Sequence, residues 1–201
     1  MAPPRVIDPT GIYHVGSNGN FDCALYLEAR DRSAFLELYA RVARKRKWTT
    51  FAYCLMTTHF HFVVQLADGG LSEGMRELNG CFSRRMNAIM GRTRRGHFFK
   101  NRFYAKAVED EAYLLGVCRY VVLNPVEAGI CEQPEQWGWS SYGASAGLCP
   151  APSFLAVDEL LAFFGSTIER ARPAYRAFVS EGHGSWSDQG NASPPPVAAA
   201  R

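Results

Sequence analysis

The chain has 201 residues, 47% hydrophobic and 13% aromatic, which suffices for one well-packed domain with an appendage. No apolar run approaches the roughly 18–20 residues that span a bilayer, and the first residues contain no apolar signal core, so we expect a cytoplasmic protein without membrane contact. The net charge of +3 is modest, and six dispersed cysteines without a Cys-x-x-Cys pair argue against a zinc knuckle and for free buried thiols.

The first third of the chain alternates predicted strands and helices. Residues 10–16 predict a strand, and residues 31–46, with apolar side chains at helical spacing and Asp31 as N-cap, predict a helix. Residues 49–56 and 59–66 are both rich in strand-forming side chains. Only Thr-Thr separates them, so we expect a tight hairpin or one bent strand pair.

The middle of the chain continues this alternation. Residues 71–90 predict an amphipathic helix, residues 91–103 a basic loop with glycines, and residues 104–108 a short strand. A third helix follows acidic residues that suit a helix N-terminus, and we expect it to end at Asn124 because Pro125 comes next. The order β-α-β-β-α-β-α predicts an α+β protein with a ferredoxin-like antiparallel sheet and helices packed on one side.

The carboxy-terminal part of the chain carries a weaker pattern. Residues 153–164 and 166–180 predict two short helices, and the final stretch, rich in proline and alanine, predicts disorder. We therefore expect a main domain over 1–145, a helical extension over 146–183 and a disordered tail over 184–201.

Basic side chains are concentrated in one part of the chain. From Leu78 to Val108 there is no aspartate or glutamate, and aromatic side chains are interleaved with the cations. Cations neutralise phosphates and aromatic rings stack on unpaired bases, so this mixture favours single-stranded or hairpin nucleic acid over an ordinary solvated face. The candidate nucleic-acid contacts are Arg84, Arg85, Arg92, Arg94, Arg95, His97, Lys100, Arg102 and Lys106.

Two histidines flank a phenylalanine in the predicted strand 59–66. Successive side chains on a strand point to opposite faces, so His59 and His61 share one face while Phe60 turns to the other. Two imidazoles on one rigid face can bind a divalent metal and leave positions open for substrate, or they can cap a solvent-exposed face. The motif alone leaves both interpretations open.

Tyr120 and Asn124 lie one turn apart on the third predicted helix and therefore share a face. A tyrosine on a helix is most often half-buried packing with a hydrogen-bonded hydroxyl. Here the phenol can also be a nucleophile, and the Asn124 oxygen can be a third metal ligand beside the two histidines. A phenol with a pKa of about 10 is a weak nucleophile, so its attack requires a polarised phosphate in an aligned geometry.

Taken together, these residues resemble the REP-associated tyrosine transposases, a branch of the single-tyrosine HUH transposases. The resemblance covers residues 10–143, and its motifs are individually weak but jointly specific. They are Tyr13-His14-Val15, Tyr53-Cys54-Leu55-Met56 before His59-x-His61, the stretch from Phe98 to Arg102, Tyr120-x-x-x-Asn124-Pro125-Val126-x-Ala128-Gly129, and Trp139-Ser140-Ser141-Tyr142.

The resemblance implies a metal-dependent tyrosine transposase whose catalytic core cuts single-stranded DNA near hairpins with Mg²⁺ or Mn²⁺. It also implies that His59, His61 and Asn124 bind the metal and that Tyr120 attacks the scissile phosphate, leaving a 5′-phosphotyrosine and a free 3′-hydroxyl. A covalent link stores the energy of the phosphodiester, so strand joining needs no organic cofactor. We expect a monomer or a homodimer.

The chain departs from the family pattern at two places, and two other functions are also compatible with its motifs. Thr57-Thr58 stands where relatives commonly carry Pro-Asn, and Asn18 stands where they carry Arg.

The first alternative function is a non-catalytic protein that binds nucleic-acid hairpins on the same fold. Its binding would be sensitive to salt and would need no metal. A metal-dependent phosphodiesterase would use the paired histidines and be indifferent to Tyr120.

Overall fold

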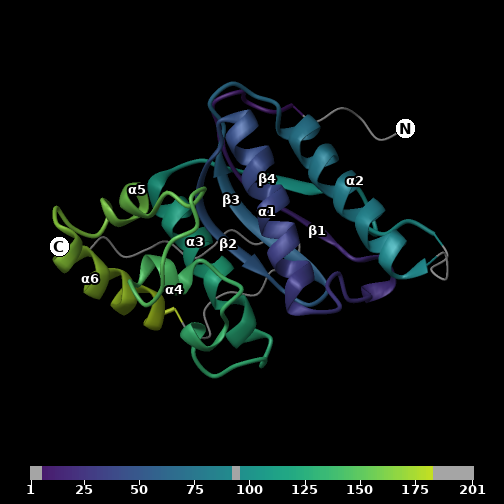
Figure 1. Cartoon of the computed structure of the whole chain (residues 1–201). Coiled ribbons are helices and arrows are strands. Elements are labelled where there is room, and N and C mark those ends of the chain that lie inside the picture. The colour runs from purple at the N-terminus through teal and green to yellow at the C-terminus, as the bar shows by residue number, and fades with distance from the viewer. Residues whose placement is uncertain (1–5, 92–95, 183–201) are drawn as a thin grey trace.

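One antiparallel sheet of four strands lies at the centre of the computed structural model, which describes residues 6–91 and 96–182 (Figure 1). The strands are β1 (Ile12–Asn18), β2 (Thr49–Leu55), β3 (His59–Gln65) and β4 (Tyr104–Val108), in the spatial order β2-β3-β1-β4. β2 and β3 form the expected hairpin, and β1 pairs with both β3 and β4. With one helix between β1 and β2 and another between β3 and β4, this order confirms the α+β, ferredoxin-like class.

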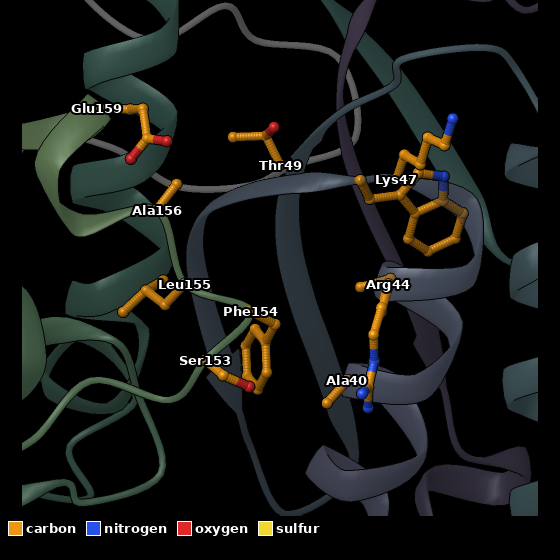
Figure 2. A pocket seen from close by; sticks show the side chains of 11 residues that line it. Ala40, Arg44, Lys47, Thr49, Ser153, Phe154, Leu155, Ala156 and Glu159 are labelled. Atoms are coloured by element: carbon orange, nitrogen blue, oxygen red, sulfur yellow. The ribbon is translucent and has the colours of Figure 1, made fainter.

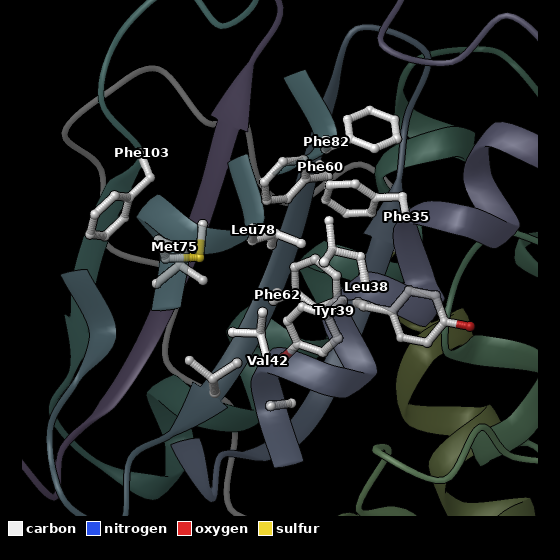
Figure 3. Close-up of a cluster of buried hydrophobic side chains, with 14 of the residues drawn as sticks. Phe35, Leu38, Tyr39, Val42, Phe60, Phe62, Met75, Leu78, Phe82 and Phe103 are labelled. Carbon is white, nitrogen blue, oxygen red and sulfur yellow. The ribbon is translucent and has the colours of Figure 1, made fainter. Parts of the chain in front are cut away.

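Two helices, α1 (Ala29–Arg46) and α2 (Leu71–Ile89), cover one face of the sheet (Figures 1 and 3). Alternation along β3 directs Phe60 and Phe62 onto this face, where they meet aromatic and aliphatic side chains of both helices. The rings of Tyr39 and Phe62 stack with their centroids 3.7 Å apart. This packing fixes the position of β3, and therefore also the position of the side chains on its other face, which include His59 and His61.

The opposite face of the sheet is covered by α3 (Glu111–Glu127). Cys54 of β2 and Val63 of β3 pack there against apolar side chains of the helix. The expectation that the helices pack on one side therefore holds for α1 and α2 but not for α3. The physical reason is that α3 is apolar around most of its circumference, so it is buried between the sheet and the carboxy-terminal helices.

Two helix ends differ from the prediction. α3 continues past Pro125 to Glu127, and the Ala128 N–H donates to the Asn124 carbonyl at 2.9 Å. A proline in a helix loses the hydrogen bond of its own N–H and crowds the carbonyl one turn earlier, and burial of the helix compensates for this cost. α1 begins at Ala29 with Glu28 as N-cap, and Asp31 instead accepts from the Glu28 N–H in a capping box.

Among the described carboxy-terminal residues are the helices α4 (Tyr142–Ser145), α5 (Val157–Leu161) and α6 (Ile168–Ser180). The described 3₁₀ turns include η1 (Asn20–Asp22) and η3 (Pro134–Gln136). α5 and α6 correspond to the two short helices that were predicted, and their apolar side chains pack in one cluster with those of α3. The tail predicted over 184–201 lies outside the described residues. None of the described helices is long and apolar enough to cross a membrane.

A cavity of about 460 Å³ lies between the carboxy-terminal end of α1 and the segment that leads into α5 (Figure 2). Arg44 and Lys47 line it from one side, and Phe154 and Glu159 line it from the other. Thr49, which begins β2, also lines this cavity. Because the β2–β3 turn is at the other end of the hairpin, the cavity is separate from the site around the histidines.

Candidate active site

The start of β3 brings two histidines to the face of the sheet that α3 covers. His61 pairs with Gly16 of β1, and Gly16 in turn pairs with Tyr104 of β4. Residues directly opposite each other in antiparallel strands point to the same face, so His61 and Tyr104 flank Gly16 on one surface. A Cβ atom at Gly16 would lie 2.5 Å from the Tyr104 hydroxyl oxygen. The glycine therefore leaves room for Tyr104 to reach His61.

Tyr104, His61 and His14 form a hydrogen-bonded triangle. The Tyr104 hydroxyl oxygen lies 2.5 Å from His61 Nδ1 and 3.2 Å from His14 Nε2, and the two imidazole nitrogens lie 3.0 Å apart. His14 is only 4% exposed, so this network is shielded from water. One ring nitrogen of His61 is thus engaged by protein groups.

Burial keeps both imidazoles of the triangle neutral. It lowers the pKa of His14 to about 3, and the charge of Lys106, which pairs with His14 across β1 and β4, acts in the same direction. Burial also lowers the pKa of His61 well below its usual value, helped by His14 and His59, while the Asn124 side chain opposes this shift. A neutral imidazole carries one N–H and one lone pair, which is the form that binds metals.

The Nε2 atom of His61 is buried and makes no hydrogen bond within the described part of the chain. His59 lies beside it, with ring centroids 4.9 Å apart. The described residues contain no group of three His, Cys, Asp or Glu that could hold a metal, so any protein ligand beyond the two histidines must be of another type. The amide oxygen of Asn124 is suitable, and two imidazoles with one amide oxygen fit Mn²⁺ or Mg²⁺ with positions left for substrate.

α3 places Tyr120 and Asn124 against this face of the sheet. The Tyr120 ring contacts the rings of His14 and His61, with centroids 5.9 and 5.7 Å away. The Asn124 side-chain amide donates to the Tyr120 carbonyl at 3.0 Å, which ties the two residues together. The four residues singled out by the motifs, His59, His61, Tyr120 and Asn124, therefore lie in one place.

His14 and Tyr104 belong to this site although the sequence alone predicted no role for them. The alternation in Tyr13-His14-Val15 was the available signal, because it turns His14 away from the two apolar neighbours. Tyr104 gave no such signal, since only the pairing of β4 with β1 places it beside His61.

The predicted nucleic-acid contacts are spread over α2, β4 and the segment that joins them. Arg84 and Arg85 are exposed on α2, and Lys106 is exposed on β4, with its Nζ 5.3 Å from the ring centroid of Tyr113. Arg92, Arg94 and Arg95 lie outside the described residues. The remaining three predicted contacts line a groove between α2 and residues 96–103; they are His97, Lys100 and Arg102.

A groove of about 870 Å³ runs between α2 and residues 96–103. Phe98, Phe99 and Phe103 line it together with the cations, and so does Arg76, which lies just before the acid-free stretch and was missed for that reason. The Lys100 N–H donates to the carbonyl of Asn18 at 2.9 Å, at the end of β1. The groove is therefore attached to the same end of the sheet as His59, which pairs with Asn18.

Comparisons with known proteins relate this arrangement to one family. The family described as "Transposase IS200 like" matches residues 24–124. A protein of Haemophilus influenzae, provisionally named a REP-associated tyrosine transposase, is 24% identical in an alignment of 117 residues that covers 54% of this chain and 66% of that relative. The match thus spans slightly less than two thirds of the relative. The solved structure of a REP-associated tyrosine transposase bound to a REP hairpin shares the fold, with a TM-score of 0.63 and 19% identity over 78% of this chain and 91% of that one.

Proposed function

This chain belongs to the family of IS200-like transposases, and we propose that it nicks and rejoins single-stranded DNA through a covalent tyrosine intermediate. The observation that carries the proposal is the convergence of Tyr120, His59, His61 and Asn124 on one face of the sheet. A protein that only binds DNA needs neither a buried pair of neutral imidazoles nor a phenol against them.

We assign the roles as follows. The Tyr120 oxygen attacks the scissile phosphorus and loses its proton to solvent, and the bond to the 3′ oxygen breaks. The departing 3′ oxygen takes up a proton from solvent, which leaves a 5′-phosphotyrosine and a free 3′-hydroxyl. His59, His61 and Asn124 hold Mg²⁺ or Mn²⁺, which supplies Lewis-acid polarisation of the phosphate. His14 and Tyr104 orient His61. Attack by a 3′-hydroxyl on the phosphotyrosine reverses the step and joins strands without an organic cofactor.

The proposed DNA is a hairpin with unpaired flanks. The related structure named for a REP hairpin supports this choice, and so does the aromatic and basic groove beside β1. The exposed Lys100 and Arg102 can neutralise phosphates there. Phe98 and Phe99 are only 4% and 8% exposed and pack in the core, so they support the groove and do not stack on bases. Further proposed phosphate contacts are the exposed Arg84 and Arg85 on α2 and His97 in the groove. Lys106 lies on the other face of the sheet, beside Tyr113 of α3, and Arg92, Arg94 and Arg95 lie in sequence between Arg85 and His97.

We further propose that residues 1–145 are the catalytic unit and that 146–183 are a helical extension. The protein acts in the cytoplasm as a monomer or a homodimer. Packing of α6 against α3 supports a structural role of the extension, since it covers the back of the helix that carries Tyr120.

The test is incubation with single-stranded hairpin DNA and Mn²⁺, followed by a denaturing gel that detects a covalent protein–DNA adduct. Tyr120→Phe should bind the DNA with unchanged affinity and form no adduct. Tyr113→Phe is the matched control, because it removes from the same helix a hydroxyl that has no hydrogen-bond partner among residues 6–91 and 96–182, and it should form the adduct normally. An adduct with Tyr120→Phe would refute the assignment of the nucleophile. Salt-sensitive binding without an adduct by the unaltered protein would favour a pure binding function.

A further inference from the structure

We propose that Arg32, flanked by the indole rings of Trp137 and Trp139, binds a phosphate of single-stranded DNA beside an unpaired base. The proposal rests on the proposed function, because it concerns the strand that enters the same site. It also gives a role to Trp139, which begins the Trp-Ser-Ser-Tyr motif that the active-site chemistry does not use.

Three aromatic rings from two segments of the chain hold the Arg32 guanidinium. Its Cζ atom lies 5.1 Å from the ring centroid of Tyr26, 5.6 Å from that of Trp137 and 5.7 Å from that of Trp139. A guanidinium packed among rings is attracted electrostatically and loses little further freedom when it binds a ligand. The side chain is therefore held in position before any DNA arrives.

The guanidinium nevertheless has no acceptor. Arg32 forms no ion pair with a carboxylate in the described part of the chain, and its buried Nε has no hydrogen-bond partner. The neighbouring Asp31 accepts from the backbone N–H groups of Leu27 and Glu28 through Oδ2 and forms no ion pair with Arg32 in the described part of the chain, although its charge favours the charged guanidinium. The buried Tyr26 hydroxyl in the same cluster also lacks a partner. Unfilled donors on a permanently charged group call for an anion with several oxygens, and phosphate is such an anion.

The cluster lies beside the turn that leads to His59. Trp137 donates from its indole nitrogen to the Leu55 carbonyl at 3.2 Å, and the Leu55 N–H donates to the Trp139 carbonyl at 2.9 Å. Leu55 ends β2, and the next residue, Met56, donates to the His59 carbonyl at 2.9 Å. The cluster is therefore connected to His59 through the end of β2, and the proposal places along it the strand whose scissile phosphate reaches His59.

The chemistry of the cluster favours an unpaired strand over a duplex. Trp137 and Trp139 are each only partly buried, so a base can stack on the exposed part of an indole while its phosphate meets Arg32. Bases inside a duplex do not offer their faces for such stacking. The cluster around Arg32 and the groove beside α2 are thus assigned to different segments of the same DNA.

The experiment compares the affinities of two DNAs, a hairpin with single-stranded flanks and the same hairpin with blunt ends, without metal so that neither is cleaved. Arg32→Gln should weaken binding of the flanked hairpin on the order of tenfold and lower its salt slope by about 0.7, the value for one phosphate on a single strand, with little effect on the blunt hairpin. Arg32→Lys should recover part of the affinity. Arg30→Gln is the matched control, since Arg30 lies on the same helix, is exposed and already pairs with Glu28.

A second measurement does not depend on the folding of a variant. Flanks that carry 5-iodouracil are crosslinked to the unaltered protein, and the attached peptide should contain Trp137 or Trp139. Crosslinks confined to residues 96–103 would overturn the proposal. Equal affinities of Arg32→Gln and the unaltered protein for flanked DNA, or an equal loss on both DNAs, would also overturn it. If the unaltered protein bound neither DNA, the proposed function itself would fail.

Discussion

The hydroxyl oxygen of Tyr104 lies 2.5 Å from Nδ1 of His61, although the two residues come from strands that do not pair with each other. Gly16 of the intervening strand β1 makes this contact possible. Nδ1 of His61 contacts Tyr104 and His14, and Nε2 is buried without a hydrogen-bond partner among the described residues. In the tautomer that carries the proton on Nδ1, the lone pair is on Nε2 and can bind a metal. Metal-binding histidines are commonly oriented in this way by a hydrogen bond to the second ring nitrogen.

Removal of the Tyr104 hydroxyl should weaken metal binding. In Tyr104→Phe, His61 keeps only the contact to His14, so its ring is less firmly held, and we expect the Mn²⁺ affinity to fall about tenfold. Isothermal titration calorimetry on the DNA-free protein measures this affinity, and His61→Ala defines the background. Tyr113→Phe should bind as the unaltered protein does. An unchanged affinity in Tyr104→Phe would show that the hydroxyl does not orient His61.

A methyl group at Gly16 should damage both the sheet and the site. The added Cβ would lie 2.5 Å from the Tyr104 hydroxyl and would also meet the Phe60 carbonyl oxygen, so backbone and ring both have to shift. We expect Gly16→Ala to lower the free energy of unfolding by about 1–3 kcal/mol, measured by urea denaturation, and to weaken Mn²⁺ binding. Gly138→Ala is the control, because its Cβ would meet no atom within 4 Å. Equal stabilities of the two variants would contradict the close approach.

The six cysteines should differ in reactivity. The expectation of free thiols agrees with the structure, but only Cys54 and Cys118 are buried, and burial raises the pKa of both. Because the thiolate is the reactive form, we expect iodoacetamide to label the exposed Cys23 and Cys149 in the native protein. Mass spectrometry should find label on Cys54 and Cys118 only after denaturation. Fast native labelling of either would show that α3 separates from the sheet.

Local rules predicted the elements well where one periodicity dominates. The alternation around Phe60 and Phe62 located β3 and its core face, and helical spacing located α1 and α2. The same rules misplaced the end of α3, because the rule for Pro125 considers only the hydrogen bond of one residue. Burial of that helix on several sides adds stability that no local pattern contains.

The active-site residues divide in the same way. The sequence by itself determined that His59 and His61 share a strand face and that Tyr120 and Asn124 share a helix face, because both facts depend only on the geometry of a single element. It did not determine that the two faces meet, since α3 was expected on the side of α1 and α2. Only the tertiary structure decided that α3 packs over the histidines.

Tertiary structure alone also decided the partners of His61 and of Arg32. His14 and Tyr104 reach His61 through the register of three strands, and the rings around Arg32 come from segments far apart in the chain. Such contacts depend on strand order and on where loops return to the sheet, which side-chain periodicity does not encode. The sequence therefore specified the chemical groups, and packing between distant segments decided which of them act together.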